Sequence, residues 1–520
     1  MAMTPSKKIL SMGLAAICLS SGCASLAPPV ERNLQITPAV ANDTELDQII
    51  STALAPFPKR SGAHFLKDGL AAFAARLAGA DRASRSIDAQ YYLFHDDVTG
   101  KLLAHRFLSA ANRGVKVRLL LDDIGIQGKD SYLLTLDAHP RIDVRIFNPF
   151  ANRRFRLFEY LYRYGVVTRR MHNKSMIIDG VVAITGGRNV GDEYYDDHKT
   201  SNFLDMDVMV FGPVVRDISG QYDEYWNSRF SYSISELARK QMAREEAEAG
   251  WVQLDQHAQT QKDGIYLKRL RETPFYDHLQ AGTLPVVIAP ALVLADRPEK
   301  IRLPLDDTST HLGPDLWPLF RQVSEELLIL NPYFIPGHDG VAALTEAVSR
   351  GARVIVLTNS LASNDVAIVH GHYAKYRKAL LRAGVELYEL RVDRPTSTSS
   401  DLADEGDEAH MSLHVKTFIF DRKKTFIGSL NLDPRSVYQN TELGVVVEDA
   451  TMAEEIATIT IDRLPDIAYE VGLDEGDRLF WLGRDPVTHE ITRYQREPDA
   501  SIVQRVLAAI SRVLPVEGQL

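Results

Sequence analysis

The chain has little cysteine: Cys18 and Cys23 are the only two among 520 residues, and both lie near the N-terminus. The rest of the chain therefore has no thiol for a disulfide, a thiolate zinc site or a cysteine nucleophile. Positive charge is also scarce, because 69 acidic residues outnumber 59 lysines and arginines and give a net charge of -10. This balance disfavours a nucleic-acid partner, since phosphate backbones are bound mainly through Lys and Arg.

The N-terminal apolar stretch, residues 9–19, is too short to span a bilayer comfortably. It follows Lys7 and Lys8 and ends in LSSGC at Cys23, an order typical of an export signal. The ending resembles the bacterial lipobox, whose cysteine becomes a lipid-bearing N-terminus after cleavage. We therefore expect a lipoprotein-type signal peptide at residues 1–22, lipidation of Cys23, and an exported protein anchored on the periplasmic side of the inner or outer membrane. The alternatives are ordinary cleavage and an uncleaved anchor.

The length of the chain exceeds what one hydrophobic core usually organises. Residues 86–93 alternate like a strand, residues 101–113 carry a helical apolar period, and residues 115–121 are typical of a buried strand. The same order recurs at residues 327–334, 341–350 and 354–357. This order predicts an α/β fold made of two like halves, each with a mixed sheet flanked by helices.

A repeated motif supports the duplication. His172 and His414 are 414 − 172 = 242 residues apart, and Asp179 with Asp421 keeps the same offset. So do two further pairs, Gly186 with Gly428 and Asn189 with Asn431. Placing Tyr91 on Tyr333 also gives 242. We interpret the chain as two repeats rather than two unrelated domains.

These boundaries define the predicted organisation. A tether at residues 23–57 precedes a first half at 58–234, a charged helical connector at 235–285 and a second half at 286–465. A C-terminal extension occupies residues 466–520. Its amphipathic run at 501–514 is predicted to dock on the body through Ile502, Val503, Val506, Leu507 and Ile510, and insertion into a membrane is the alternative. The connector is expected to be solvated, and the acidic segment 396–408 is expected to be a mobile surface loop.

Each motif is typical of a strand, a turn and a strand. Side chains two residues apart on a strand share a face, so His172 and Lys174 project together, as do His414 and Lys416. Each aspartate comes seven residues after its histidine, an odd spacing that predicts a place in the turn. The Asp-Gly pair at Asp179 favours holding the turn over touching a substrate.

Both copies match His-x-Lys-x4-Asp followed by Gly-[Gly/Ser]-x-Asn, and the chain thereby resembles the phospholipase D superfamily. The resemblance implies two phospholipase D-like halves that are related by pseudo-two-fold symmetry and share one active site, with His172, Lys174, Asp179, His414, Lys416 and Asp421 as the catalytic set. It also implies chemistry without a metal or another cofactor.

Cleaving a phosphodiester needs a nucleophile, charge on the non-bridging oxygens and a proton for the leaving alkoxide. One neutral imidazole can attack phosphorus and form a phosphohistidine, while the second acts as general acid and later as base. Family precedent favours His172 as the nucleophile and His414 as the acid. Lys174 and Lys416, with Asn189 and Asn431, are expected to stabilise the developing charge.

A histidine base needs its other ring nitrogen fixed, and two carboxylates are candidates. Asp205 and Glu442 both enter apolar strand-like runs after the glycine loops, with a separation of 442 − 205 = 237. A surface role is the alternative for either residue. By resemblance, Glu442 belongs to the Asn-x-Glu element that begins at Asn440, which favours the orienting role there.

The superfamily match alone does not name a substrate, because the same half-sites serve phospholipases, phospholipid synthases and nucleases. Several stretches resemble bacterial cardiolipin synthases of the C type: SIDAQYYLFHDDVTGKLL, MHNKSMIIDGVVAITGGRN, IGSLNLDPRSVYQNTELG and EPDASIVQRVLAAISRVLPVEGQL. This resemblance implies transfer of a phosphatidyl group from phosphatidylethanolamine or phosphatidylglycerol to phosphatidylglycerol, at a membrane surface. The alternatives are a hydrolytic phospholipase D that releases phosphatidic acid and an exported phosphodiesterase or nuclease.

One segment adds a separate argument for a membrane. Residues 152–170 interleave aromatic residues with arginines, and a helix there would align Phe155, Phe158 and Tyr162 in one stripe. The flanking arginines suit a boundary with anionic headgroups, Arg153, Arg154 and Arg156 among them. An ordinary packed helix with solvated arginines is the alternative.

Overall fold

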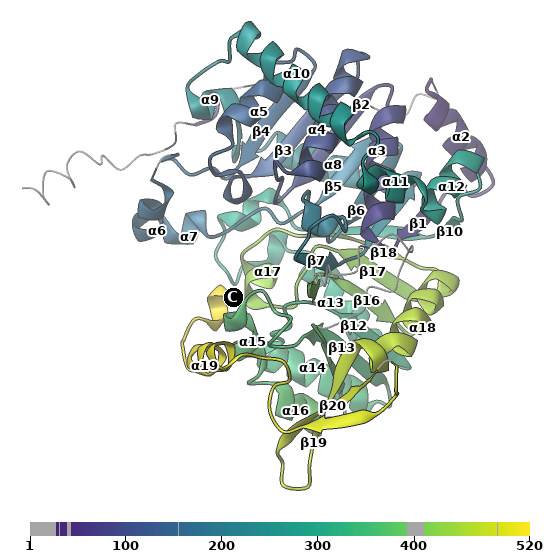
Figure 1. Ribbon diagram of the computed structural model, residues 1–520, viewed down its shortest axis with the longest axis vertical. Helices are drawn as coiled ribbons and strands as arrows, with labels where there is room; N and C mark the ends of the chain where they lie inside the picture. Colours follow the sequence, from purple (N-terminus) through teal and green to yellow (C-terminus); the bar gives the residue numbers. More distant parts are fainter. Residues whose placement is uncertain are drawn as a thin grey trace, which may run out of the picture.

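The computed structural model describes residues 26, 28–30, 32–38, 43–153, 155–392, 410–485 and 487–520. It consists of two large mixed sheets flanked by helices, the first built mainly from the first half of the chain and the second from the later half (Figure 1). The predicted signal peptide, Cys23, Arg154 and the acidic segment 396–408 lie outside the described residues. Within the described part of the chain, no helix combines the length and apolarity required to cross a membrane.

The first sheet runs β10-β1-β8-β6-β5-β2-β3-β4-β9. Strands β2, β3 and β4 are parallel neighbours, and the other pairs are antiparallel. The bounds are β10 Val287–Ala289, β1 Ser61–Leu66, β8 Asp207–Phe211, β6 Val182–Gly186, β5 Ser175–Ile178, β2 Ser86–Tyr91, β3 Lys116–Asp122, β4 Ile142–Phe147 and β9 Ser231–Ser233.

The second sheet runs β11-β18-β17-β16-β12-β13-β14-β19-β20-β21. Its parallel neighbours are β12, β13 and β14. The bounds are β11 Ala291–Ala295, β18 Leu443–Val447, β17 Lys424–Gly428, β16 Thr417–Phe420, β12 Glu326–Leu330, β13 Arg353–Asn359, β14 Glu386–Leu390, β19 Ala468–Leu473, β20 Leu479–Arg484 and β21 Ile491–Tyr494.

The two strand orders are equivalent from β1 to β9 and from β11 to β19, so the predicted α/β duplication is confirmed. Parallel strands joined by helical crossovers are covered on both faces and therefore need nearly continuous apolar runs. Strand β3 meets this requirement, since six of its seven residues are buried, and β13 is buried to the same extent.

Helices cover both sheets. In the first half these are α3 Gly69–Arg82, α4 Val98–Asn112, α5 Asp130–Asp137 and α8 Pro213–Trp226; in the second they are α13 Gly313–Gln322, α14 Gly337–Ser349, α15 Ala367–Tyr373, α16 Arg377–Arg382, α17 Pro434–Tyr438 and α18 Ala450–Ile467. Side chains fix several helix starts: Asp97 accepts a hydrogen bond from the Gly100 N–H of α4, and Asp449 accepts one from the Met452 N–H of α18.

One apolar core belongs to both halves. Strands β6 and β8 of the first sheet pack against β17 and β18 of the second. Val208, Val210 and Ala183 are buried there together with Ile427 and Val445. Burial of such side chains is the main favourable term in folding, so neither half is complete without the other.

The register of the strands corrects one sequence alignment. Ile87 of β2 pairs with Ile178, and the equivalent Leu327 of β12 pairs with Phe420. The motif strands keep the offset of 242, whereas β2 and β12 are related by 327 − 87 = 240. Tyr91 is therefore equivalent to Asn331, and its pairing with Tyr333 in the sequence comparison is wrong.

The predicted connector, which was expected to be solvated, and part of the predicted tether both pack on the first half. The connector forms α10 Arg244–Gln261, α11 Ile265–Arg271 and α12 Pro274–Ala281, and α10 lies across α4 and α5 with Leu254 buried. Residues 32–38, predicted to lie in a tether, are held at Thr37, whose N–H donates to Asp223 at 2.8 Å. The helix α2 Glu45–Leu54 follows.

The C-terminal region differs from expectation in its orientation. Helix α19 Ile502–Ser511 lies on α15 through Ala508 and Ser511, which close on Gly371 so tightly that no side chain fits there. The residues predicted to form the docked face point outward, and Ile502 is 78% exposed. Small residues allow the close approach of two helices, and the larger apolar side chains are left facing solvent.

Candidate active site

The two predicted half-sites meet between the sheets. His172 and Lys174 directly precede β5, and His414 and Lys416 directly precede β16, the equivalent strand. The histidines are only 7% and 8% exposed. The charges of both lysines act on both imidazoles, which places the two half-sites in one site.

Each histidine is oriented by a carboxylate from the opposite half. His172 Nδ1 lies 2.9 Å from Glu442 Oε2, and His414 Nδ1 lies 2.5 Å from Asp205 Oδ2. Glu442 comes two residues before Gly444, which pairs with Gly428. In the first half, Asp205 comes two residues before Asp207, which pairs with the equivalent Gly186. The two carboxylates are therefore equivalent, and each leaves Nε2 of its histidine free for chemistry.

The main chain crosses between the halves in the same way. The His172 N–H donates to Thr441 O at 2.8 Å, and the His414 N–H donates to Leu204 O at 2.8 Å. Around His414 this contact extends into a two-stranded parallel sheet of β7 Ser201–Leu204 with β15 His410–Leu413. We call these paired backbone and side-chain contacts the crossed clamp.

A third contact fixes the residue before each histidine, and the sequence comparison missed it. The Met171 N–H donates to Asp122 at the end of β3, at 2.9 Å, and the Leu413 N–H donates to Asn359 at the end of β13, at 2.8 Å. The two acceptors, Asp122 and Asn359, are separated by 359 − 122 = 237 residues. Asp205 and Glu442 have the same separation. That repeated spacing is the signal that would have identified them.

The two lysines lie against their own histidines. Lys174 Nζ donates to the His172 carbonyl oxygen at 2.6 Å, and Lys416 Nζ donates to that of His414. Burial lowers the pKa of both ammonium groups, that of Lys416 to about 8. Both ammonium groups thus lie beside the histidines, and a bound anionic phosphate would raise their pKa and be stabilised by their charge.

Both imidazoles are held in the neutral form. Burial lowers the pKa of His172 to about 4, with Lys174 adding to this effect and Glu442 opposing it. Burial and then Lys416 and Lys174 lower the pKa of His414 well below its ordinary value. Burial alone would raise the pKa of Glu442, but His172, Lys174 and Ser429 together outweigh it and the pKa is lowered. An ionised carboxylate therefore faces a neutral His172 at neutral pH.

The motif asparagines and two tyrosine rings are the other side chains of the candidate site. Asn189 accepts the Leu93 N–H at 3.2 Å and donates to Tyr194 Oη at 2.9 Å, while Asn431 Oδ1 is buried with no partner among the described residues. Tyr92 packs edge-on to His172 at 4.9 Å, and Tyr194 packs edge-on to His414 at 5.2 Å between ring centroids. Neither tyrosine was singled out in the sequence, because no periodic pattern marks it.

Asp179 and Asp421 lie in the turns after β5 and β16, away from the imidazoles. Both have left-handed backbones, with φ of 53° and 52°. The Asp179 carboxylate accepts the N–H groups of residues 84–86 before β2. Asp421 does the same for residues 324–326 before β12. Burial raises the pKa of Asp421, but these donors outweigh it and the pKa is lowered.

We expect Asp179→Ala to destabilise the fold without rearranging the half-sites. Three backbone donors lose their acceptor and alanine is strained at positive φ, so the free energy of unfolding should fall by about 2–4 kcal/mol. Asp179→Asn keeps an acceptor and tolerates this backbone, and should lose about 1 kcal/mol. The midpoint of urea unfolding measures both. Equal midpoints for Asp179→Ala and the wild type would contradict the structural role.

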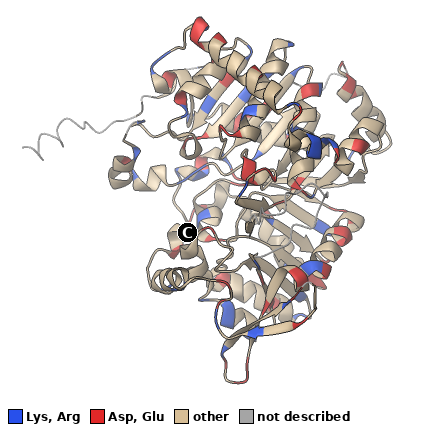
Figure 2. Ribbon diagram, viewed as in Figure 1, with Lys and Arg blue, Asp and Glu red and all other residues tan. Residues whose placement is uncertain are grey.

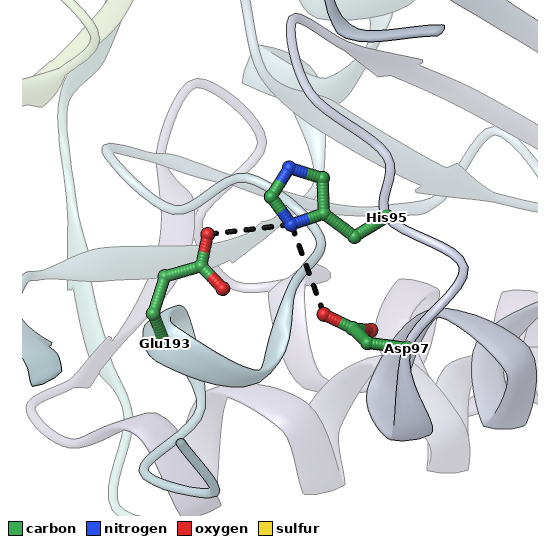
Figure 3. Close-up of side chains that lie close together, drawn as sticks. All are labelled: His95, Asp97 and Glu193. Atoms are coloured by element: carbon green, nitrogen blue, oxygen red, sulfur yellow. Dashed lines mark ion pairs between the residues drawn. The ribbon is translucent and has the colours of Figure 1, made fainter. Parts of the chain in front are cut away.

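A group near Tyr194 has the spacing of a cation site. His95 Nδ1 lies 3.4 Å from Glu193 Oε1 and 3.7 Å from Asp97 Oδ2 (Figure 3). The Asp97 oxygens are already used, since they accept the N–H groups of Gly100 and Asp192. The contact with Glu193 raises the pKa of His95. The group is thus explained as an ion pair that holds the loop carrying Asn189.

The arginines of residues 152–170 do not flank a helix stripe. The segment breaks into η2 Arg156–Phe158, α6 Glu159–Tyr162 and α7 Tyr164–Val167. Arg153 binds Asp123 and Asp130, Arg156 binds Asp123, and Arg163 binds Glu159. The expectation of headgroup contacts by Arg153 and Arg156 is therefore wrong, because their charges are neutralised within the protein.

Comparison with protein families gives one match over more than half of the chain. The model described as "Cardiolipin synthase, PLD-like domain" matches residues 77–228 and 316–462. These two segments contain the first and the second half-site.

Individual relatives agree with this match. Cardiolipin synthase C of Escherichia coli (strain K12) is 42% identical over 465 residues, covering 88% of this chain and 96% of the relative. Cardiolipin synthase B of Shigella flexneri is 27% identical over 385 residues, covering 74% and 76%. Among solved structures, phosphatidylserine synthase of Haemophilus influenzae Rd KW20 superimposes with a TM-score of 0.55 at 14% identity, over 91% of this chain and 100% of that one. This last likeness concerns the fold.

Proposed function

Because the chain belongs to the cardiolipin synthase family with a phospholipase D-like domain, we propose that it transfers a phosphatidyl group from a donor phospholipid to phosphatidylglycerol and so makes cardiolipin. The donor would be phosphatidylethanolamine or phosphatidylglycerol. The observation that carries the proposal is the crossed clamp, which fixes two imidazoles in one buried site with both Nε2 atoms free.

In the first step His172 Nε2 attacks the phosphorus of the donor. The bond between phosphorus and the headgroup oxygen breaks, and His414 gives a proton to the leaving alcohol. The product is a phosphatidyl group on His172. In the second step a glycerol hydroxyl of phosphatidylglycerol attacks phosphorus, His414 takes the hydroxyl proton, and the bond from phosphorus to nitrogen breaks.

The electrostatics suit these roles. The lowered pKa of His172 keeps its imidazole neutral and nucleophilic at neutral pH. His414 must carry a proton when it acts as an acid, and an anionic phosphodiester bound beside it would raise its pKa. Lys174, Lys416 and the asparagines Asn189 and Asn431 would stabilise the equatorial oxygens. Each step is thus supplied by a side chain, and no metal or other cofactor is invoked.

Hydrolysis is the competing reaction at the same site, with water in place of phosphatidylglycerol and phosphatidic acid as the product. The near-complete burial of both histidines favours transfer, because a closed site limits the access of water to the phosphohistidine. A nuclease is less well supported, since the net charge of -10 disfavours binding of a polyanionic nucleic acid.

Product analysis separates these reactions. The purified enzyme is incubated with phosphatidylglycerol alone and with added phosphatidylethanolamine, and the lipids are resolved by mass spectrometry. We expect cardiolipin in more than tenfold excess over phosphatidic acid. Phosphatidic acid as the main product would establish the hydrolase instead, and nicked DNA with unchanged lipid would rule out both lipid activities.

We further propose an exported lipoprotein anchored at Cys23 on the periplasmic side, from the sequence of the N-terminal segment. Labelled palmitate should enter the wild type and not Cys23→Ala. Equal label in both would overturn the lipid anchor.

A further inference from the structure

Two groups of large apolar side chains face solvent. The first is on η2, α6 and α7 and comprises Phe155, Leu157, Phe158, Leu161 and Tyr164. The second is on and after α19 and comprises Ile502, Val503, Val506, Ile510 and Val513. Leu161 is 81% exposed and Val513 is 80% exposed. Large contiguous apolar patches are rare on soluble monomers and mark surfaces that bind a partner or a membrane.

Helices α6, α7 and α19, which carry most of the two groups, lie on the same side of the molecule (Figure 1). Tyr164 Oη donates to Gln519 Oε1 at 3.2 Å. The Arg435 guanidinium donates to Thr168 O after α7 and to Gln519 O, which ties both segments to α17. Since Gln519 is six residues beyond Val513, the chain from the end of the second group spans at most about 22 Å. We call the two groups together the apolar face.

The charges around the apolar face select the kind of partner. Arg153, Arg156 and Arg163 beside the first group are paired with carboxylates of the protein. Helix α19 has no acidic residue (Figure 2), and Arg512 directly after it is exposed. On a chain with a net charge of -10, the two carboxylates of these segments, Glu159 and Glu517, are each paired with a cation, Arg163 and Lys375. Such a surface can enter the headgroup region of anionic phospholipids, whereas an acidic surface would be repelled.

The apolar face is joined to the site by short connections. Helix α7 ends at Val167, five residues before His172. Helix α17, which holds both segments through Arg435, is followed directly by the residues that clamp His172, because Thr441 and Glu442 come soon after Tyr438. A lipid held at this surface would therefore be bound by segments that lead directly into the residues around His172.

Arg32, near the start of the described residues, is connected to α7 of the apolar face by a short series of contacts. Arg32 forms an ion pair with Glu236 and donates to Ser231 O at 3.5 Å. Ser231 pairs with Phe147, and the next residue, Asn148, donates to Val166 O of α7 at 2.9 Å. A membrane anchor ahead of residue 32 would hold this edge, and with it the apolar face, toward the bilayer.

We propose that the apolar face is a docking surface for a bilayer of anionic phospholipid, which it enters through the side chains of α6, α7 and α19. The inference rests on the proposed lipid substrate. Because apolar side chains carry most of the contact, binding should depend weakly on salt, and it should be lost when these side chains become polar.

The test uses the full chain with Cys23→Ser, so that a covalent lipid does not mask docking. Two variants are compared with this protein: Ile502→Gln/Val506→Gln/Ile510→Gln on α19, and Leu157→Gln/Leu161→Gln on η2 and α6. Both should reduce sedimentation with vesicles of phosphatidylglycerol and phosphatidylcholine by roughly tenfold or more. Raising salt from about 0.1 to about 0.5 M should weaken binding of the parent protein by less than about threefold.

A matched control carries Val252→Gln/Ile265→Gln/Ile459→Gln, three exposed apolar residues on α10, α11 and α18. It should bind vesicles like the parent. Both docking variants should unfold at the parent temperature and keep activity on short-chain phosphatidylglycerol below its micelle concentration, since their changes are outside the site.

The outcomes separate this inference from the proposed function. Vesicle binding without any cardiolipin product would leave the docking surface standing and overturn the proposed reaction. Cardiolipin synthesis with vesicle binding unchanged in both variants would overturn the docking surface. Conversion of a dimer to a monomer by the α19 variant, with vesicle binding unchanged, would assign the face to a second copy of this chain and likewise overturn the inference.

Discussion

His172→Ala should reduce cardiolipin formation by about 10⁴-fold or more, and His414→Ala should reduce it by a similar factor. The two residues act in one reaction, so removing either leaves a site that can bind but cannot complete a turnover. Neither loss can be replaced by the other histidine, because each imidazole is held by its own carboxylate from the opposite half.

An activated donor can divide the reaction into its two steps. A phosphatidyl nitrophenyl ester needs no acid to release its leaving group, so His414→Ala should still form the phosphohistidine but should fail to pass it to phosphatidylglycerol. Mass spectrometry should then find the adduct on the peptide containing His172. An adduct on His414 in the His172→Ala enzyme would reverse the two roles.

A nearby histidine provides the control for these losses. His410 is exposed, at the start of β15, four residues before His414. His410→Ala removes an imidazole from the same segment without touching the crossed clamp. Its activity should stay within about twofold of wild type, and a loss comparable to that of His414→Ala would show that damage to β15, rather than loss of the acid, explains the effect.

Glu442→Gln should lower kcat by about 10² to 10⁴-fold with little change in KM, because Glu442 acts through His172 rather than on the substrate. A glutamine amide can donate to Nδ1 and so stabilise the tautomer with a proton on Nε2, which cannot attack phosphorus. Asp205→Asn should have the corresponding effect through His414.

The pH profile distinguishes positioning from simple damage. Glu442 raises the pKa of His172, although burial keeps that pKa at about 4. Removing the carboxylate should therefore lower the pKa further and move the acidic limb of kcat/KM to lower pH. An unchanged acidic limb would contradict the contact with His172 as the source of the effect.

The activated donor gives a second readout, specific to each carboxylate. Glu442→Gln should slow formation of the phosphohistidine, whereas Asp205→Asn should slow its transfer to phosphatidylglycerol. Glu448→Gln is a suitable control, because Glu448 lies six residues after Glu442 in an exposed pair with Lys424 and should be near wild type. If both substitutions slowed the same step, the assignment of Glu442 to His172 and of Asp205 to His414 would be contradicted.

The chemistry of the site could be predicted in part from local spacing. Side chains two residues apart on a strand share a face, and this rule predicted Lys174 beside His172. The structure places both residues just ahead of β5 rather than in the strand, with Lys174 Nζ on the His172 carbonyl oxygen. The seven-residue spacing likewise puts Asp179 in a turn, where it accepts three backbone N–H groups. These features depend on backbone geometry over a few residues, which residue spacing along the sequence predicts.

Other expectations failed because they depended on distant contacts. The Tyr91 alignment slipped by two residues because the connections outside the motif strands differ in length between the halves. Arg153 was expected at a membrane boundary, but Asp123 and Asp130 lie within reach of it only after folding. The amphipathic pattern of α19 indicated a helix with one apolar face and could not say which way that face turns.

The sequence by itself determined the two half-sites, their strand and turn geometry and the duplicated α/β fold, because each follows from local periodicity or from direct repetition. Only the tertiary structure decided that His172 is clamped by Glu442 and His414 by Asp205. Carboxylates that are 270 and 209 residues away from their histidines become neighbours through the packing of one half against the other. No spacing along a single chain encodes that exchange, since it arises from the shared core between the two sheets.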